Sequence, residues 1–348
     1  MVRFIKKMVV SLSAVFLLLA SLEIAFRIYD YGFKYRELEY RYSKGEVNLP
    51  FDTLFAYFFK KGYIVRDQKL IWRRSAKKKG QYRFGSLGFR IGDKGEPLRS
   101  KGDNTYRIIV FGGSQPFGIG LDYEDTYACK LEALFNKDPS TWKRPVEVIN
   151  AAVPGHSTTQ ALNFLKYDMI CYEPDLVIID AGNNDGIQLS PEWPWSDNEL
   201  IERMGHFQYR LLGMIERSSF FWYYRNLLYK LRGIFLTDKS HPKKTCPTRV
   251  TTEQNFNNLK EIKRIAQDNG FKAVFISQVY FDNDTGKLKR GFGSFEEPYI
   301  DIYSRLKEKD GLGDYFIDSV HSSRLGHKEI ARLIYEYVKP LVLGDLRQ

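Results

Sequence analysis

The sequence predicts an α/β protein whose parallel sheet is covered by helices on both faces, preceded by an N-terminal transmembrane helix. Three features of the 348 residues lead to this prediction. Short apolar runs recur along the chain, helical patterns separate them, and a long apolar segment lies at the N-terminus. Near-continuous apolar strands that alternate with helices are typical of parallel sheets buried on both faces.

The expected elements begin after residue 105. Strands are expected at 106–111, 146–151, 176–181, 273–279 and 315–317, and helices at 127–135, 158–169, 256–269 and 326–338. Because ligands bind at the carboxyl ends of strands in such sheets, we expect the chemical residues to gather at that edge. We therefore divide the chain into an anchor at 1–30, a basic linker or small subdomain at 31–105, and the main domain at 106–348.

The N-terminal segment has a basic head followed by apolar residues. Arg3, Lys6 and Lys7 precede the apolar run 8–22, which continues to Ile28. A cleaved signal peptide needs small residues before its cut site, but cuts after Ala20 or Ser21 place leucine at the −3 position, and a cut after Ala25 places Glu23 there. We expect an uncleaved membrane anchor with the body of the protein outside the cytoplasm.

The formal net charge of +11 is concentrated in one part of the chain. Residues 34–101 carry 18 basic against 7 acidic side chains, so the remainder is close to neutral. No nucleic-acid recognition module accompanies this charge, and we expect no nucleic-acid partner. Its place after the apolar segment favours contact with anionic lipid headgroups or an acidic polymer, with a solvated surface as the alternative.

Within 31–105, glycines at 84–97 indicate short turns or a small hairpin.

An insertion at about 187–252 has a different character. It mixes aromatic, aliphatic and basic residues at roughly helical spacing. Three interpretations remain open, namely a lid over the site, a face that rests on the membrane, and an ordinary packing pair of helices.

The stretch FGGSQPFGIG at 111–120 places Ser114 among four glycines, directly after the first expected strand. It lacks the lysine of a phosphate-binding loop, the spacing of a dinucleotide fingerprint and the G-x-S-x-G of a nucleophile elbow. Three partners give Ser114 a chemical context. Gly155 follows the second strand, Asn184 follows the third, and Asp318 and His321 follow the last in a D-x-x-H spacing.

These residue types match the needs of acyl transfer by serine. The hydroxyl needs an imidazole to take its proton, and a carboxylate holds that imidazole in the useful tautomer. The developing oxyanion needs hydrogen-bond donors, which the backbone N–H groups of Ser114 and Gly155 and the amide of Asn184 can supply. His156 is a candidate substrate contact, Asp185 is expected to brace its loop, and His327 is expected to be structural.

This combination resembles the SGNH (GDSL-type) hydrolase family over roughly residues 106–339. The resemblance implies a flavodoxin-like three-layer α/β/α sandwich, with Ser114 as nucleophile, His321 as base, Asp318 as its orienting carboxylate, and Ser114, Gly155 and Asn184 as oxyanion donors. Two departures occur: Gly113 stands where the family often has aspartate, and Ser322 stands where proline frequently follows the histidine.

The sequence therefore predicts a membrane-anchored extracytoplasmic esterase that cleaves acyl esters of a carbohydrate or lipid, with acetyl esters among the candidates. An acyltransferase that hands the acyl group to an envelope polysaccharide, and a noncatalytic envelope binding protein, are the alternatives. The three cysteines match no metal-binding spacing, so we expect no metal and no cofactor.

Overall fold

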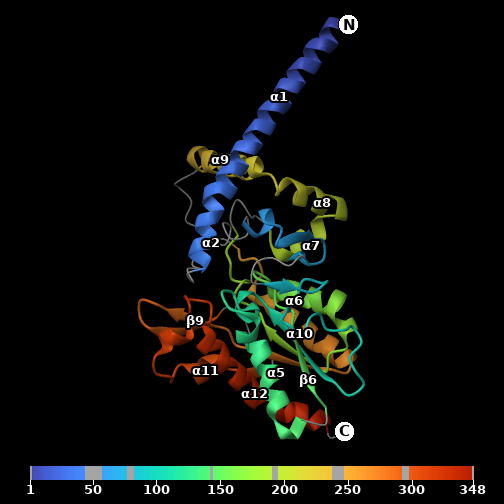
Figure 1. Ribbon diagram of the computed structural model, residues 1–348, viewed down its shortest axis with the longest axis vertical. Helices are drawn as coiled ribbons and strands as arrows, with labels where there is room; N and C mark the ends of the chain where they lie inside the picture. Colours follow the sequence, from blue (N-terminus) through green and yellow to red (C-terminus); the bar gives the residue numbers. More distant parts are fainter. Residues whose placement is uncertain are drawn as a thin grey trace. The chain divides into compact units, whose positions relative to one another are not determined.

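The computed structural model describes residues 2–43, 57–76, 82–141, 144–189, 195–236, 247–291 and 298–346. The chain forms two compact units. The helical unit combines Met1–Gly62 with Phe207–Lys244, and the sheet unit combines Tyr63–His206 with Thr245–Gln348. Each unit is therefore built from segments that lie far apart in the sequence (Figure 1).

The sheet unit contains a seven-stranded sheet in the order β11-β8-β7-β5-β6-β4-β3. Its parallel strands are β5 (Tyr106–Gly112), β6 (Val146–Asn150), β7 (Leu176–Asp180), β8 (Lys272–Ile276) and β11 (Tyr299–Ile300). Numbered along the chain, these strands lie in the order 2-1-3-4-5, which is the flavodoxin-like order. This confirms the predicted fold class.

Helices cover both faces of this sheet (Figure 1). Alternate residues of β5 point to opposite faces, so Ile108 and Val110 join the core beneath α5 (Tyr127–Lys137) and α12 (Arg324–Leu346). On the other face, Phe111 meets Phe164 of α6 edge to face. That face is covered by α6 (Thr158–Phe164) and α10 (Thr252–Asp268). All seven residues of β5 are buried, as its central position requires.

Helix starts in this unit follow local capping rules. Ser157 and Thr251 cap α6 and α10 with complete capping boxes, in which the side chains of Gln160 and Gln254 accept a hydrogen bond from the backbone N–H of the cap residue. Thr126 caps α5 through its side-chain oxygen. The smaller elements are β1 (Ile64–Asp67), β2 (Ile71–Arg74), α4 (Ser114–Phe117), α7 (Asp197–Arg203), β9 (Val279–Asp282), β10 (Lys287–Arg290) and α11 (Ile302–Leu306).

Residues 63–105, from the region expected to be a linker or small subdomain, add strands to the sheet unit. β3 (Arg83–Phe84) and β4 (Arg90–Ile91) form the predicted small hairpin, and β4 pairs with β6 at Asn150. Much of the positive charge of this region is used internally. Arg73 binds Asp67 and Asp168, and similar ion pairs occupy Arg83, Lys94 and Lys101.

The prediction of a strand at 315–317 is wrong. Leu312–Tyr315 forms a 3-10 turn, and Phe316 makes only an isolated bridge with Ser322. The fifth parallel strand is instead β11, which pairs with β8. A three-residue apolar run cannot be distinguished from a buried turn by pattern alone.

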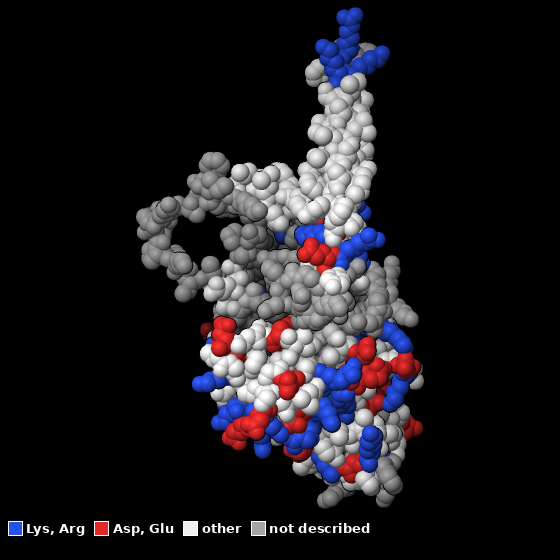
Figure 2. Space-filling view, turned by 60° about the vertical axis from the view of Figure 1, so that its left-hand side comes forward, with Lys and Arg blue, Asp and Glu red and all other residues white. Residues whose placement is uncertain are grey.

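The helical unit contains α1 (Val2–Tyr29), α2 (Tyr35–Ser43), α8 (His206–Ile215) and α9 (Ser219–Leu236). A π-helical segment, Asp30–Lys34, joins α1 to α2. Among the described residues, one helical stretch, Arg3–Leu38, is long and apolar enough to cross a membrane, as expected of a signal sequence or an anchor. Figure 2 shows α1 as an apolar rod with Lys and Arg side chains at its free tip.

Candidate active site

Ser114 follows β5 and is the first residue of the short helix α4. Gly112 has a φ of 155°, and a β-carbon there would lie 2.0 Å from the carbonyl oxygen of Asp180. Gly118 ends α4 in the left-handed conformation, with a φ of 73°. Glycine is required at these two positions because a side chain would clash or strain the backbone.

Arg90 fixes the far end of α4. Its buried guanidinium donates to the carbonyl oxygens of Phe117, Gly118 and Leu121 and stacks against the Phe117 ring. The carbonyl of Phe117, the last residue of α4, is one that the end of a helix leaves without an intrahelical partner. A residue from the β3–β4 hairpin therefore holds the turn that carries Ser114.

Ser114, His321 and Asp318 form one chain of hydrogen bonds. The Ser114 Oγ lies 2.8 Å from the His321 Nε2, and the His321 Nδ1 lies 2.7 Å from the Asp318 Oδ2. An ionised carboxylate only accepts hydrogen bonds, so Nδ1 carries the proton and Nε2 presents its lone pair to the serine hydroxyl. The side chains of His321 and Asp318 are 13% and 8% exposed, which leaves the imidazole accessible at one edge.

Local backbone geometry holds Asp318 in this arrangement. Its Oδ1 accepts from the backbone N–H groups of Val320 and His321, each at 2.7 Å. Burial opposes ionisation of Asp318, but the hydrogen bonds and positive charge of His321 and the two backbone amides outweigh it and lower the pKa of the carboxyl. The carboxylate is therefore charged when the imidazole becomes charged.

Tertiary contacts hold the loop that carries both residues. Ile317 N–H donates to the carbonyl of His321 at 2.8 Å, and the Phe316 ring stacks on Phe281 with centroids 5.3 Å apart. Asp318 and His321 therefore lie on a loop that reaches the same edge of the sheet as Ser114. The strand expected before them is absent.

Asn184 and the Gly155–His156 peptide lie beside the turn of Ser114. The Asn184 Nδ2 donates to the carbonyl of His156 at 3.0 Å, which leaves the second N–H of the amide for another acceptor. A β-carbon on Gly113 would lie 2.4 Å from Asn184 Nδ2 and 3.5 Å from the His156 oxygen. Position 113 therefore has to be small for Asn184 to approach the serine turn this closely.

The expectation that His156 contacts substrate is not supported. The ring is 1% exposed, and its Nε2 lies 3.0 Å from the carbonyl oxygen of Trp72. Burial, only partly offset by the Trp72 carbonyl, lowers the pKa of His156 to about 3, so the ring is neutral. His156 contributes its backbone carbonyl, which holds Asn184, while its ring packs in the interior.

A buried network supports the loops of Gly155 and Asn184. Arg249 donates to the carbonyl of Gly155 at 2.9 Å and pairs with Asp197 at 2.8 Å, and its side chain is 1% exposed. Asp185 accepts from the backbone and hydroxyl of Thr158 and from Asn255, so it joins its own loop to α6 and α10. Burial raises the pKa of Asp185 to about 6.

Sequence reasoning missed Arg90, Asp197 and Arg249. All three are buried, and Asp197 and Arg249 come from the insertion that we expected at about 187–252. A buried arginine that binds backbone carbonyls leaves no motif in the sequence, because its partners can carry any side chain.

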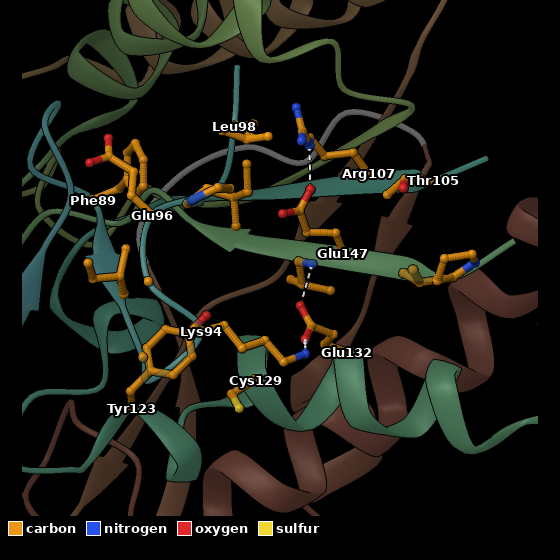
Figure 3. A pocket seen from close by; sticks show the side chains of 18 of the residues that line it. Phe89, Lys94, Glu96, Leu98, Thr105, Arg107, Tyr123, Cys129, Glu132 and Glu147 are labelled. Atoms are coloured by element: carbon orange, nitrogen blue, oxygen red, sulfur yellow. Dashed lines mark hydrogen bonds and ion pairs between the residues drawn. The ribbon is translucent and has the colours of Figure 1, made fainter. Parts of the chain in front are cut away.

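A cavity of about 770 Å³ lies elsewhere, beside strand β6 (Figure 3). Two ion pairs lie in its lining, with Lys94 bound to Glu132 and Arg107 bound to Glu147 at 2.7 Å. Burial and nearby carboxylates raise the pKa of the lining Cys129 to about 11, so its thiol is unreactive. Neither Ser114 nor His321 lines this cavity. Within the described part of the chain, His, Cys, Asp and Glu side chains form no group of three or more suited to hold a metal ion.

The sequence matches no protein-family model and no curated protein. Solved structures match the chain at low identity. A lipase/acylhydrolase from Enterococcus faecalis is 16% identical, with 68% of this chain and 96% of that chain covered and a TM-score of 0.40. TesA is 16% identical, with 68% of this chain and 99% of that chain covered and a TM-score of 0.39.

A third match is a putative lipolytic protein of the G-D-S-L family from Desulfitobacterium hafniense. It is 11% identical, with 67% of this chain and 99% of that chain covered and a TM-score of 0.36. At such identities and TM-scores, the function has to be inferred from the atoms of this chain.

Proposed function

We propose that this chain is a serine ester hydrolase of the SGNH type that cleaves acyl esters of a carbohydrate or lipid through an acyl-enzyme. The proposal rests on one observation, the continuous hydrogen-bond chain from the Ser114 Oγ through the His321 imidazole to the Asp318 carboxylate, at 2.8 and 2.7 Å. In nucleophilic catalysis, the nucleophile lies within hydrogen-bond reach of a base, and a third group orients that base.

The first half of the reaction forms the acyl-enzyme. Ser114 Oγ attacks the carbonyl carbon of the ester while His321 Nε2 takes the hydroxyl proton. Negative charge develops on the carbonyl oxygen, and the N–H groups of Ser114 and Gly155 and the amide of Asn184 stabilise it. The C–O bond to the alcohol then breaks, and the proton on His321 passes to the leaving alcohol oxygen.

The second half releases the acid. A water molecule attacks the acyl carbon while His321 takes one of its protons, and the same donors stabilise the second oxyanion. The bond from the acyl carbon to Ser114 Oγ then breaks, and His321 returns the proton to the serine oxygen. Asp318 remains ionised throughout and stabilises the imidazolium in each half.

We also propose that α1 anchors the chain in a membrane with the sheet unit outside the cytoplasm. The length and apolar composition of Arg3–Leu38 support the membrane-crossing helix. Alkaline phosphatase fused after Lys101 is expected to be active in cells, and an inactive fusion would overturn the orientation.

The catalytic proposal is tested with the full chain in detergent micelles. The variant Ser114→Ala should lose turnover of a chromogenic short-chain acyl ester and labelling by a fluorophosphonate probe. Ser140→Ala is the matched control, because Ser140 is exposed and its hydrogen bonds within the described part of the chain go to Asp138. Equal turnover by Ser114→Ala and the parent chain would reject the serine mechanism, and a parent chain that neither labels nor turns over would favour a noncatalytic protein.

The ratio of acyl transfer to hydrolysis separates the proposed hydrolase from an acyltransferase. Both reactions pass through the same acyl-serine and differ in whether water or a sugar hydroxyl attacks it. Transfer that exceeds hydrolysis when a sugar acceptor is supplied would replace the hydrolase proposal.

A further inference from the structure

The helices α8 and α9 expose apolar side chains at helical spacing. Residues three, four and seven apart lie on the same face of a helix. Seven such side chains are between 40% and 75% exposed, namely Phe207, Leu211 and Met214 on α8 and Tyr224, Leu227, Leu228 and Leu231 on α9. We call this set the outer stripe. A run of large exposed apolar side chains on two consecutive helices indicates a surface that is covered by something other than water.

Buried polar groups hold the start of α9. Ser219 is 0% exposed, and its Oγ donates to Asp30 at 2.6 Å. One turn further along, the hydroxyl of Tyr223 donates to the other oxygen of Asp30 at 2.8 Å. Lys60, whose side chain is 3% exposed, completes the cluster with an ion pair to Asp30 at 2.6 Å. The side of α9 that meets α1 is thus held by buried hydrogen bonds, while the outer stripe is left exposed.

The end of α1 holds the start of α9. The carboxylate of Glu23 accepts from the backbone N–H groups of Ser219 and Phe220 at 3.2 and 2.8 Å, which are amides that the start of a helix leaves unpaired. Arg27 pairs with the same carboxylate at 2.5 Å. The rings of Phe26 and Tyr223 stack with their centroids 4.4 Å apart. Figure 1 shows α9 crossing α1 near this end.

The length of the uncharged part of α1 sets the depth of this junction. The residues between Lys7 and Glu23 number 15 and span about 22 Å at 1.5 Å per residue. The hydrocarbon core of a bilayer is about 30 Å thick. If α1 crosses a membrane, Glu23 therefore lies no further out than the boundary between acyl chains and headgroups. The first turn of α9 is bonded to Glu23, so it lies at the same depth.

We propose that α8 and α9 lie in the boundary of the same bilayer that α1 crosses, with the outer stripe in contact with lipid. This proposal rests on the membrane location given under Proposed function. A bilayer is favoured over a second copy of the chain because the stripe belongs to the same compact unit as α1 and begins at the depth where α1 leaves the hydrocarbon. Lipid contact removes the apolar stripe from water without any further protein surface.

Site-directed spin labelling of the full chain in proteoliposomes tests the proposal. The native cysteines are replaced by serine, and a single cysteine is introduced at Leu228, at Met214 or at Leu98, which is 78% exposed in the sheet unit. Labels at Leu228 and Met214 should be several-fold more accessible to oxygen, relative to a water-soluble nickel complex, than the label at Leu98. Asn226→Cys, at an exposed polar position of α9, is the matched control and should give a lower ratio than Leu228→Cys.

A label at Val15, within the apolar run of α1, separates the two proposals. If Val15 is lipid-accessible while Leu228 and Met214 behave like Leu98, the interfacial placement is overturned and the anchor stands. If Val15 is also in water, both the anchor and the interfacial placement fail. If labels on the outer stripe are shielded from oxygen and nickel alike and broaden each other between chains, the stripe is covered by a second copy and the lipid proposal is overturned.

Discussion

The guanidinium of Arg249 donates to the carbonyl oxygen of Gly155 at 2.9 Å, across 94 positions of sequence. The same guanidinium closes on the carboxylate of Asp197 at 3.0 and 2.8 Å. Both side chains of the ion pair are fully enclosed, with exposed fractions of 1% and 0%. The insertion therefore does more than extend from the sheet, because two of its charged residues fix the backbone of the proposed oxyanion loop.

Breaking this ion pair should cost stability and catalysis together. Arg249→Met leaves the Asp197 charge buried without its partner, which is expected to lower the free energy of unfolding by about 3–5 kcal/mol. The double variant Arg249→Met/Asp197→Leu should recover most of that loss because no lone charge remains. Urea unfolding gives both values. If the double variant is as unstable as the single one, the loss comes from the missing attraction between the two side chains and not from the unpaired charge of Asp197.

The positioning effect of Arg249 has a separate readout. If the guanidinium acts by holding the Gly155 loop, the double variant should keep its folded stability but lose kcat, with a smaller change in KM. A kcat equal to that of the parent chain would contradict a positioning role.

Replacement of Asn184 should reduce the stabilisation of the oxyanion. Loss of one such donor commonly lowers kcat by about 10²–10³-fold, so Asn184→Ala is expected to lose activity in that range. Gly113→Ala should also lower kcat. The new β-carbon would lie 2.4 Å from Asn184 Nδ2, so the amide has to move away from the turn of Ser114. Steady-state kinetics of an acyl ester measure both effects.

The two substitutions should not be additive. Gly113→Ala in the Asn184→Ala background is expected to add little, since the amide that it displaces is already gone. Gly344→Ala is the matched control, because a β-carbon there meets nothing within 4 Å. Full additivity would mean that Gly113 acts on the turn of Ser114 instead of on Asn184.

Asp318→Asn should retain the fold and lose most of the activity. The amide can still accept from the backbone N–H groups of the loop, but an N–H directed at Nδ1 favours the tautomer in which Nε2 carries the proton. That ring cannot accept the Ser114 proton, so kcat should fall by about three to four orders of magnitude. Fluorophosphonate labelling rates should fall in parallel, and an unchanged melting temperature would separate this effect from unfolding.

The buried histidine His327 predicts a specific pH dependence of stability. Its Nδ1 accepts from the backbone N–H of Tyr127 at 3.0 Å, and burial together with nearby positive charge lowers its pKa to about 3. In the unfolded chain the pKa is about 6.5, so between these values the unfolded state binds more protons. Stability is therefore lost as the pH falls below 6.5, by about 1.4 kcal/mol per pH unit for this residue.

Asp180 acts in the opposite sense. Burial, only partly offset by hydrogen bonds from Gln278 and Tyr127, raises its pKa to about 6, so between about pH 4 and pH 6 the folded state binds more protons. In urea unfolding from pH 7 to pH 4, His327→Asn should lose less stability on acidification than the parent chain, and Asp180→Asn should lose more. Parallel curves for the parent and both variants would contradict these assignments.

The sequence predicts those parts of the structure that are encoded by pattern or local spacing. The runs that became β5, β6, β7 and β8 are long enough to identify as strands, and capping residues mark the starts of the helices between them. The D-x-x-H spacing of Asp318 and His321 allows a hydrogen bond within one loop. The carboxyl-end rule for parallel sheets then brings Ser114 and Asn184 to one edge.

What the sequence did not predict depends on long-range contacts. β11 consists of two residues and has no pattern of its own, while the run at 315–317 resembles a strand and forms a turn. Arg90 and Arg249 were overlooked because they bind backbone carbonyls, and the close approach of Asn184 to Gly113 was not predicted because the two residues are distant in sequence. The exposure of the outer stripe follows from which face of α9 meets α1, which periodicity alone cannot determine.

The junction between Glu23 and the start of α9 also bears on how the protein is made. The carboxylate and the amide of Phe220 lie 197 positions apart. At about 5–20 residues per second, the ribosome needs roughly 10–40 s to bridge that interval. During this time Glu23 can pair with Arg27 of its own helix, whereas its hydrogen bonds to Ser219 and Phe220 form only after the middle of the chain has emerged.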